Sequence, residues 1–163
     1  MSGLHRTPMK TLLSERLALH GLLAIFLSTT LFHVLVMVGV IPFALVWGSR
    51  LQDHSQMLRF EAVSLTITLL MLVVVGVRAG YVKIRIPPRV MTVFFGLMCL
   101  LFLVNTAGNL ASNNPLEQLL FTPLTLLLAL LSLRVALGSV RQSSRGAGRE
   151  VGVNPDGQAA RRG

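Results

Sequence analysis

The sequence predicts an all-α integral membrane protein, folded as a four-helix up-down-up-down bundle. First, the 163-residue chain is 53% apolar and has a mean hydropathy of +0.70, more apolar surface than a soluble domain of this size buries. Second, the apolar residues fall into four runs, each close to or above the ~20 residues that cross a bilayer. Third, the Lys and Arg residues flank these runs rather than interrupt them, as is typical of membrane helices.

The four runs divide the chain into three parts. Residues 1–20 form a basic segment with a helix-start signal, which predicts a short helix at the membrane interface. Residues 138–163 are rich in Gly, Ser and Arg, so we expect a disordered basic tail. The transmembrane domain, 21–137, contains predicted spans at 21–47, 62–80, 90–110 and 116–137. The first span exceeds the bilayer thickness, so we expect it to tilt or to kink at Pro42.

The positive charges indicate an orientation in the membrane. Of the 15 Lys and Arg residues, only Arg50 and Arg59 lie in the loop between the first two spans, and the other 13 share the opposite side. The positive-inside rule therefore predicts a multi-pass protein of the inner (plasma) membrane with both termini in the cytoplasm. Basic residues beside apolar runs favour anionic lipid over nucleic acid. We expect membrane lipids as partners, together with a protein partner or a second copy of the chain, and no nucleic acid.

Polar side chains recur at one depth in three of the spans. Asn105 and Asn109 are four residues apart and share a helix face. The second span carries a polar face near its start, and the fourth span carries a small and polar stripe that includes Thr125. These stripes predict an outward-facing polar pocket. Its candidate residues are His33, Glu61, Ser64, Thr68, Asn105, Asn109, Glu117 and Thr122. The alternative is helix packing, because small and polar residues also favour contact between membrane helices.

Two ionisable residues of this set have competing interpretations. His33 lies well inside the first span, where an ionisable residue is a candidate for ligand or proton chemistry. It can also be a neutral imidazole that is hydrogen-bonded to a neighbouring helix. Glu61 begins the second span, where it can be interfacial, pair with Arg50 or Arg59, or line the pocket.

Other motifs point to structure. Asn114-Pro115-Leu116-Glu117 reads as a helix-capping box. Gly76 and Gly80 match the small-xxx-small spacing, which indicates helix packing or a dimer contact. No second His lies within a span, Cys99 is the only cysteine, and neither a phosphate loop nor a nucleophile elbow is present. We therefore predict no cofactor, no metal site and no assigned catalytic residue.

Several local motifs lie between Leu31 and about Gly138. They are Phe32-His33, Gly39 with Pro42, Trp47-Gly48, Asn109-Leu110-Ala111-Ser112, Glu117 and Pro123. On these residues the chain resembles a group of small bacterial four-span membrane proteins. The resemblance implies the four-helix fold and the bacterial inner membrane, and it carries no activity.

Three functions are compatible with these patterns, and we expect them in the following order. A non-catalytic helper or interaction protein should depend on small residues such as Gly76 and Gly80 more than on His33. A binder or carrier of an amphipathic lipid-like ligand should turn Asn105, Asn109 and Glu61 inward around a cavity. A small membrane enzyme acting on a lipid-like substrate would use His33 or Glu61 as acid or base. Such an enzyme needs two titratable groups near one substrate, whereas the sequence places His33 deeper in the membrane than Glu61 or Glu117.

Overall fold

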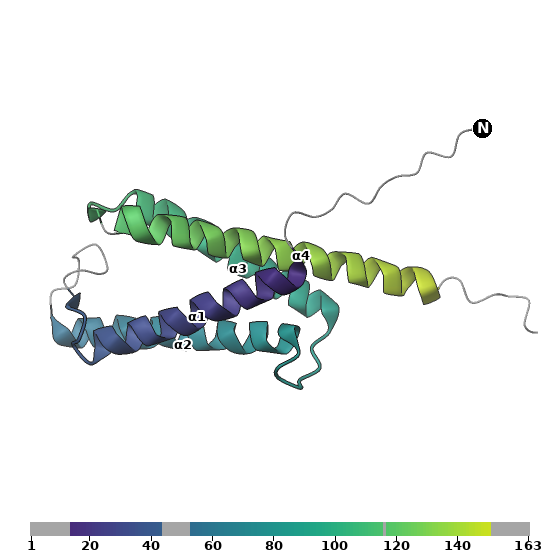
Figure 1. Ribbon diagram of the computed structural model, residues 1–163, viewed down its shortest axis with the longest axis horizontal. Helices are drawn as coiled ribbons and strands as arrows, with labels where there is room; N and C mark the ends of the chain where they lie inside the picture. Colours follow the sequence, from purple (N-terminus) through teal and green to yellow (C-terminus); the bar gives the residue numbers. More distant parts are fainter. Residues whose placement is uncertain (1–13, 44–52, 116, 151–163) are drawn as a thin grey trace, which may run out of the picture.

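The protein is a bundle of long helices. The computed structural model describes residues 14–43, 53–115 and 117–150, with side chains omitted at 117 and 141–150. Within these ranges it is all-helical, has no strand, and contains four helices long and apolar enough to span a membrane. They are α1 (Glu15–Met37), α2 (His54–Ala79), α3 (Pro88–Leu110) and α4 (Thr122–Glu150), the last preceded by a π-helical turn, η3 (Glu117–Phe121) (Figure 1). The predicted helical membrane fold is confirmed at this level.

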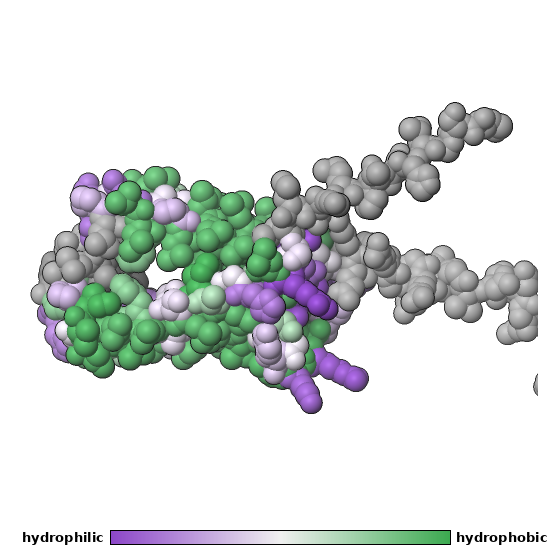
Figure 2. Space-filling model, viewed as in Figure 1, coloured by the Kyte–Doolittle hydropathy of each residue, from purple (hydrophilic) through white to green (hydrophobic). Residues whose placement is uncertain are grey.

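The helices form two pairs that meet along one seam. α1 lies against α2 and α3 lies against α4, whereas the pairs touch each other mainly through α1 and α4 (Figure 1). The start of α1 meets the end of α2 through an ion pair between Glu15 and Arg78. We call this the basic end, because the hydrophilic residues gather here (Figure 2). The other end, which holds the end of α1 and the turn after α3, is the turn end.

The apolar core is strongest near the basic end. There, residues of all four helices form one buried cluster that includes Leu22, Val75, Phe95 and Val135. A Cβ on Gly21 would lie 3.2 Å from Leu131 Cδ1, so the backbones of α1 and α4 approach closely. At the turn end a second cluster, built on Val36 and Met57, joins α1 and the residues just after it to α2 within the described part of the chain. The two apolar clusters are separate, and polar side chains occupy the level between them.

The ends of α1 differ from the predicted span of 21–47. The helix begins earlier because the Ser14 hydroxyl accepts the backbone N–H of Leu17 at 3.2 Å and Glu15 is held by Arg78. It ends at Met37, because Gly39 adopts a left-handed conformation with φ of 80°. The helix therefore stops before Pro42 instead of kinking there. The predicted interfacial helix in residues 1–20 falls largely outside the described ranges, and so do the Trp47-Gly48 motif and Arg50.

Local capping also sets the ends of α2. Its first turn starts at the Asp53 cap, whose carboxylate accepts the N–H of Gln56 at 2.7 Å, so α2 begins before the predicted residue 62. Its last turn closes at Gly80, which has a φ of 87°, with Tyr81 N–H donating to the Gly76 carbonyl at 2.9 Å. The Gly76 and Gly80 spacing thus has a role in terminating the helix.

α4 is irregular at its start and longer than predicted. Pro123 has no N–H to donate to the previous turn and its ring displaces a carbonyl there, which accounts for the widened turn η3 just before it. The sequence predicted disorder from Gly138, whereas α4 continues from there to Glu150, the last residue that the structure describes. Contact with α1 extends it, because a side chain on Gly138 would collide with the Glu15 carboxylate and Ser139 is buried.

Candidate functional site

A histidine and a glutamate meet between α1 and α2. His33 Nδ1 lies 2.6 Å from Glu61 Oε2, and the exposed fractions of the two side chains are 13% and 1%. Both residues belong to candidate membrane spans. At 1.5 Å per residue they lie about 6 Å and about 10 Å from the turn-end termini of their helices. The pair is therefore withdrawn from the helix ends, at the level between the two apolar clusters.

The surrounding sequence explains why the glutamate faces inward. Met57, four residues before Glu61, and Thr68, seven residues after it, are also buried, so all three share the α2 face that meets α1. A carboxylate on this face loses its hydration and needs a polar partner. The imidazole of His33 is such a partner from the neighbouring helix, whereas the sequence suggested Arg50 or Arg59.

The geometry assigns different roles to the two imidazole nitrogens. A carboxylate accepts, so in the neutral ring Nδ1–H donates to Glu61 and Nε2 is left with a lone pair. Nε2 has no hydrogen-bond partner among the residues that the structure describes. A carboxylate that fixes the tautomer and orientation of a histidine prepares its other nitrogen to accept a proton or a hydrogen bond.

A second polar group joins α3 to α4. The Thr106 hydroxyl donates to the Thr125 hydroxyl at 2.9 Å, and the Asn109 amide donates to the same oxygen at 3.4 Å. Thr125 in turn donates to backbone carbonyls of its own helix, including that of Thr122 at 3.1 Å. These side chains hold the two helices together, in the manner of polar contacts between membrane helices.

The turn after α3 is stabilised by its own polar groups. Gln118 Nε2 donates to the Ser112 carbonyl at 2.6 Å, and the Ser112 hydroxyl accepts the N–H of Asn114 at 3.1 Å. Gln118 N–H also donates to the Asn114 carbonyl at 3.2 Å. The Glu117 side chain lies outside the described part, so the capping box remains a prediction.

Aromatic rings connect the two polar groups. Phe32, beside His33 on α1, packs edge-on against Phe121 of η3, with ring centroids 5.8 Å apart. Phe121 also supplies a carbonyl that accepts the Thr125 hydroxyl at 2.8 Å. Toward the turn end the space-filling surface shows an opening between the two helix pairs (Figure 2). The arrangement places an oriented imidazole beside a pair of aromatic rings.

The structure divides the predicted pocket into separate groups. His33 and Glu61 form one group, and Asn109 joins Thr125 in the other. Thr68 is buried below Glu61, and Ser64 and Thr122 are half-buried. Asn105 is exposed on α3 and belongs to neither group.

Three contributors were not among the candidate site residues predicted from the sequence. Thr106 is buried, and the signal that could have found it is its spacing of three residues from Asn109, which places both on one face. Phe32 and Phe121 have no polar signature, so only the packing reveals their position.

No metal site is visible in the described part of the chain, where no three His, Cys, Asp or Glu residues cluster. Comparison with protein-family models, curated proteins and solved structures finds no match. Function must therefore be inferred from the geometry of the His33–Glu61 pair, of the polar side chains between α3 and α4, and of the helices around them.

Proposed function

We propose that the chain is a bacterial inner-membrane protein whose helices cross the bilayer up-down-up-down, with both termini in the cytoplasm. The charge distribution supports this orientation, since only Arg50 and Arg59 of the 15 Lys and Arg residues lie in or beside the segment that joins α1 to α2. The basic end then faces the cytoplasm and the turn end faces outward. The His33–Glu61 pair accordingly belongs to the outer half of the bundle.

The function that the geometry supports best is binding of an amphipathic, lipid-like molecule between the two helix pairs. The observation that carries this proposal is the His33–Glu61 hydrogen bond of 2.6 Å, placed where the apolar packing of the bundle is interrupted. A carboxyl group that is 1% exposed is expensive to keep within a membrane helix, and such residues are usually functional. Helix packing alone does not require an ionisable pair.

The chemistry of the pair defines the ligand class. Glu61 holds the imidazole so that Nε2 presents a lone pair, which suits a ligand that donates a hydrogen bond. Phe32 and Phe121 supply apolar surface nearby. The ligand is therefore a lipid-like molecule whose head group carries a hydroxyl, as in a lipid alcohol or a quinol.

A small membrane enzyme acting on the same class of molecule is the second candidate. An imidazole held by a carboxylate is also the arrangement of a general base, so His33 would accept the hydroxyl proton in that case. The helper protein has less support than the sequence suggested, because Gly76 and Gly80 serve the end of α2. Binding requires only the groups already in place, and for that reason we rank it above catalysis.

The test is to identify what the purified protein retains. The full chain is purified in a mild detergent, and lipid-soluble molecules are extracted and measured by mass spectrometry. The variants are His33→Gln and Glu61→Gln. The controls are Ser28→Ala on α1 and Thr66→Val on α2, because each of these exposed side chains bonds only to its own helix.

The expected result is one discrete hydroxyl-bearing molecule in the wild type and in both controls. Loss of one hydrogen bond of about 1.4 kcal/mol reduces occupancy at sub-saturating ligand about tenfold in His33→Gln and Glu61→Gln. An identical set of lipids in all five proteins refutes binding at His33. Chemical conversion of the retained molecule by the wild type, and not by His33→Gln, would establish the enzyme instead.

A further inference from the structure

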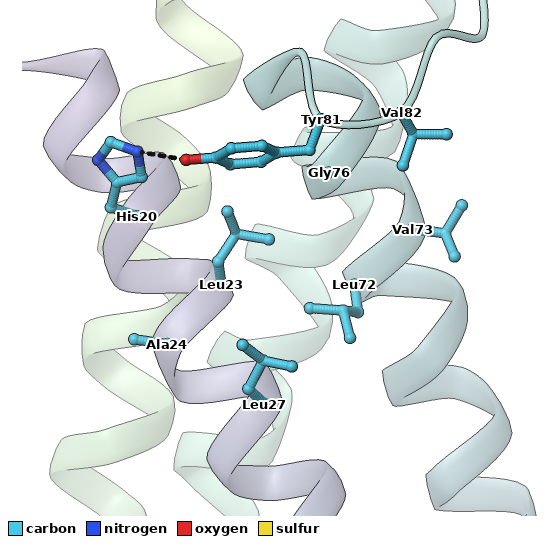
Figure 3. A pocket seen from close by; sticks show the side chains of 9 residues that line it. All are labelled: His20, Leu23, Ala24, Leu27, Leu72, Val73, Gly76, Tyr81 and Val82. Atoms are coloured by element: carbon cyan, nitrogen blue, oxygen red, sulfur yellow. Dashed lines mark hydrogen bonds between the residues drawn. The ribbon is translucent and has the colours of Figure 1, made fainter.

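A second feature, separate from the His33 site, lies on the surface near the basic end of α1 and α2. There the two helices leave an apolar groove of about 550 Å³. Figure 3 shows Leu23, Ala24 and Leu27 of α1 on one wall and Leu72 and Val73 of α2 on the other. The volume lies in the range of about 300–1,000 Å³ that is typical of small-molecule sites. No polar group of the His33 site lines it.

The groove has a polar boundary at its basic end. His20 Nε2 and the Tyr81 hydroxyl share a hydrogen bond of 3.1 Å across the space between α1 and the end of α2 (Figure 3). Both side chains are exposed. A histidine and a tyrosine at the border between an apolar surface and a charged end are suited to the head-group level of a bilayer, where one part of the side chain is apolar and the other wet.

Two exposed cations lie close in sequence to the residues of this boundary. Arg16 lies four residues before His20, one helical turn closer to the basic end on the same face. Lys83 directly follows Val82, which lines the groove. Both are exposed, and the nearest acid of α1, Glu15, is paired with Arg78. The apolar groove thus ends near exposed positive charge.

We propose that this groove binds one anionic phospholipid. An acyl chain lies between Leu27 and Val73, and the phosphate group sits near His20 and Tyr81, within reach of Arg16 and Lys83. The positive charge near this end of the groove selects an anionic over a zwitterionic lipid, because cationic pockets between membrane helices recognise anionic head groups. The site is independent of the proposed ligand at His33, since it uses other residues, the other end of the bundle and its lipid-facing side.

The experiment counts bound lipids by native mass spectrometry. The full chain is reconstituted in nanodiscs that contain equal amounts of phosphatidylglycerol and phosphatidylcholine and is then released. We expect the wild type to retain one phosphatidylglycerol in preference to phosphatidylcholine. The double variant Arg16→Gln and Lys83→Gln should reduce this preference by roughly 30-fold, from about 1 kcal/mol for each cation.

The groove itself is tested by filling it. Ala24 is exposed and lines the groove, so Ala24→Phe adds bulk there without entering the core and should abolish retention. Val73→Trp fills the groove from the other wall and should act in the same way. The control is Ala107→Phe, because Ala107 is also exposed but lies on α3, and it should retain the lipid as the wild type does.

Three results would overturn the proposal. Equal retention of both lipids by the wild type removes the anionic selectivity. An unchanged preference in the Arg16 and Lys83 variant removes the proposed head-group site. Retention of phosphatidylglycerol by both groove-filling variants would mean that the cations attract lipid at the surface and the groove holds none. None of these results depends on whether a ligand is found at His33.

Discussion

The hydrogen bond between His33 and Glu61 predicts a measurable energetic coupling between α1 and α2. The perturbation is a double-mutant cycle of His33→Leu, Glu61→Leu and the combined variant. Leucine has no polar group, so each single change removes one partner and leaves the other. Because Glu61 is 1% exposed and His33 is 13% exposed, the carboxyl group is the partner that water reaches less easily.

Three effects set the magnitude. Hydrogen bonds between membrane helices average about 0.6 kcal/mol and reach about 1.7 kcal/mol, since the unfolded chain in the membrane also finds partners. Charge-assisted bonds contribute about 1.5–3 kcal/mol. Removing one member of a buried ion pair costs about 3–5 kcal/mol, but only if the remaining group stays charged. The first two effects describe the single hydrogen bond between His33 and Glu61, and the third sets an upper limit.

We therefore expect intermediate values that depend on which partner is lost. His33→Leu should lower the free energy of unfolding by about 2 kcal/mol, because it leaves the carboxyl group buried. Glu61→Leu should lower it by about 1 kcal/mol, because the more exposed imidazole finds water more easily. The combined variant should cost about 1.5 kcal/mol, so that the coupling is about 1.5 kcal/mol.

The assay is reversible unfolding of each protein in mixed micelles, followed by circular dichroism. A control cycle uses Thr29→Val and Thr66→Val, whose hydroxyls donate to their own helices at 2.8 Å, and it should be additive. If the His33 and Glu61 changes are also additive within about 0.5 kcal/mol, the two side chains do not stabilise each other and the reasoning is refuted.

Three further outcomes follow from the geometry. Asn109→Leu should lower the free energy of unfolding by about 0.6 kcal/mol, because this variant loses a contact with α4. Asn105→Leu, on the exposed face of α3, should leave the free energy of unfolding unchanged or raise it. Thermal melts of both variants in one detergent compare the two effects. The backbone N–H of Gln56, and then the Ser55 hydroxyl, hold the pKa of the Asp53 carboxyl below its ordinary 3.8. Its contribution to stability is therefore complete above that value and is lost as the pH falls through the lower folded-state pKa, so Asp53→Asn should flatten this acid limb in melts recorded against pH. Gly80→Ala should cost about 1–2 kcal/mol in the same melts, because φ is 87°.

The sequence predicts the four spans well because lipid leaves few alternatives for an apolar run. It predicts the helix ends poorly, since hydropathy does not detect capping. Ser14 and Asp53 start their helices with side-chain hydrogen bonds, and both lie outside the apolar runs. The extension of α4 past Gly138 depends on contact with Glu15, which is 123 residues earlier in the chain.

For the candidate site, the sequence predicts which side chains share a helix face, but it does not predict which residues they contact. Glu61 and Thr68 share an inward face, as their spacing indicates. Asn105 and Asn109 do not behave alike, although they are four residues apart. Four residues turn an α-helix by about 400°, so the second side chain is rotated by about 40° from the first. On α3 that rotation separates an exposed amide from one that contacts Thr125.

The distribution of apolar contacts also bears on the ligand site that we propose at His33. All four helices pack together near the basic end, whereas among the described residues the buried cluster near the turn end belongs to the α1–α2 pair. The large cluster therefore joins the two helix pairs near the basic end, and the residues beside His33 pack mainly within the α1–α2 pair. Opening the two helix pairs at the turn end would break the Phe32–Phe121 contact and leave the large cluster intact. Such a separation would leave the His33–Glu61 hydrogen bond in place, because both residues belong to the α1–α2 pair.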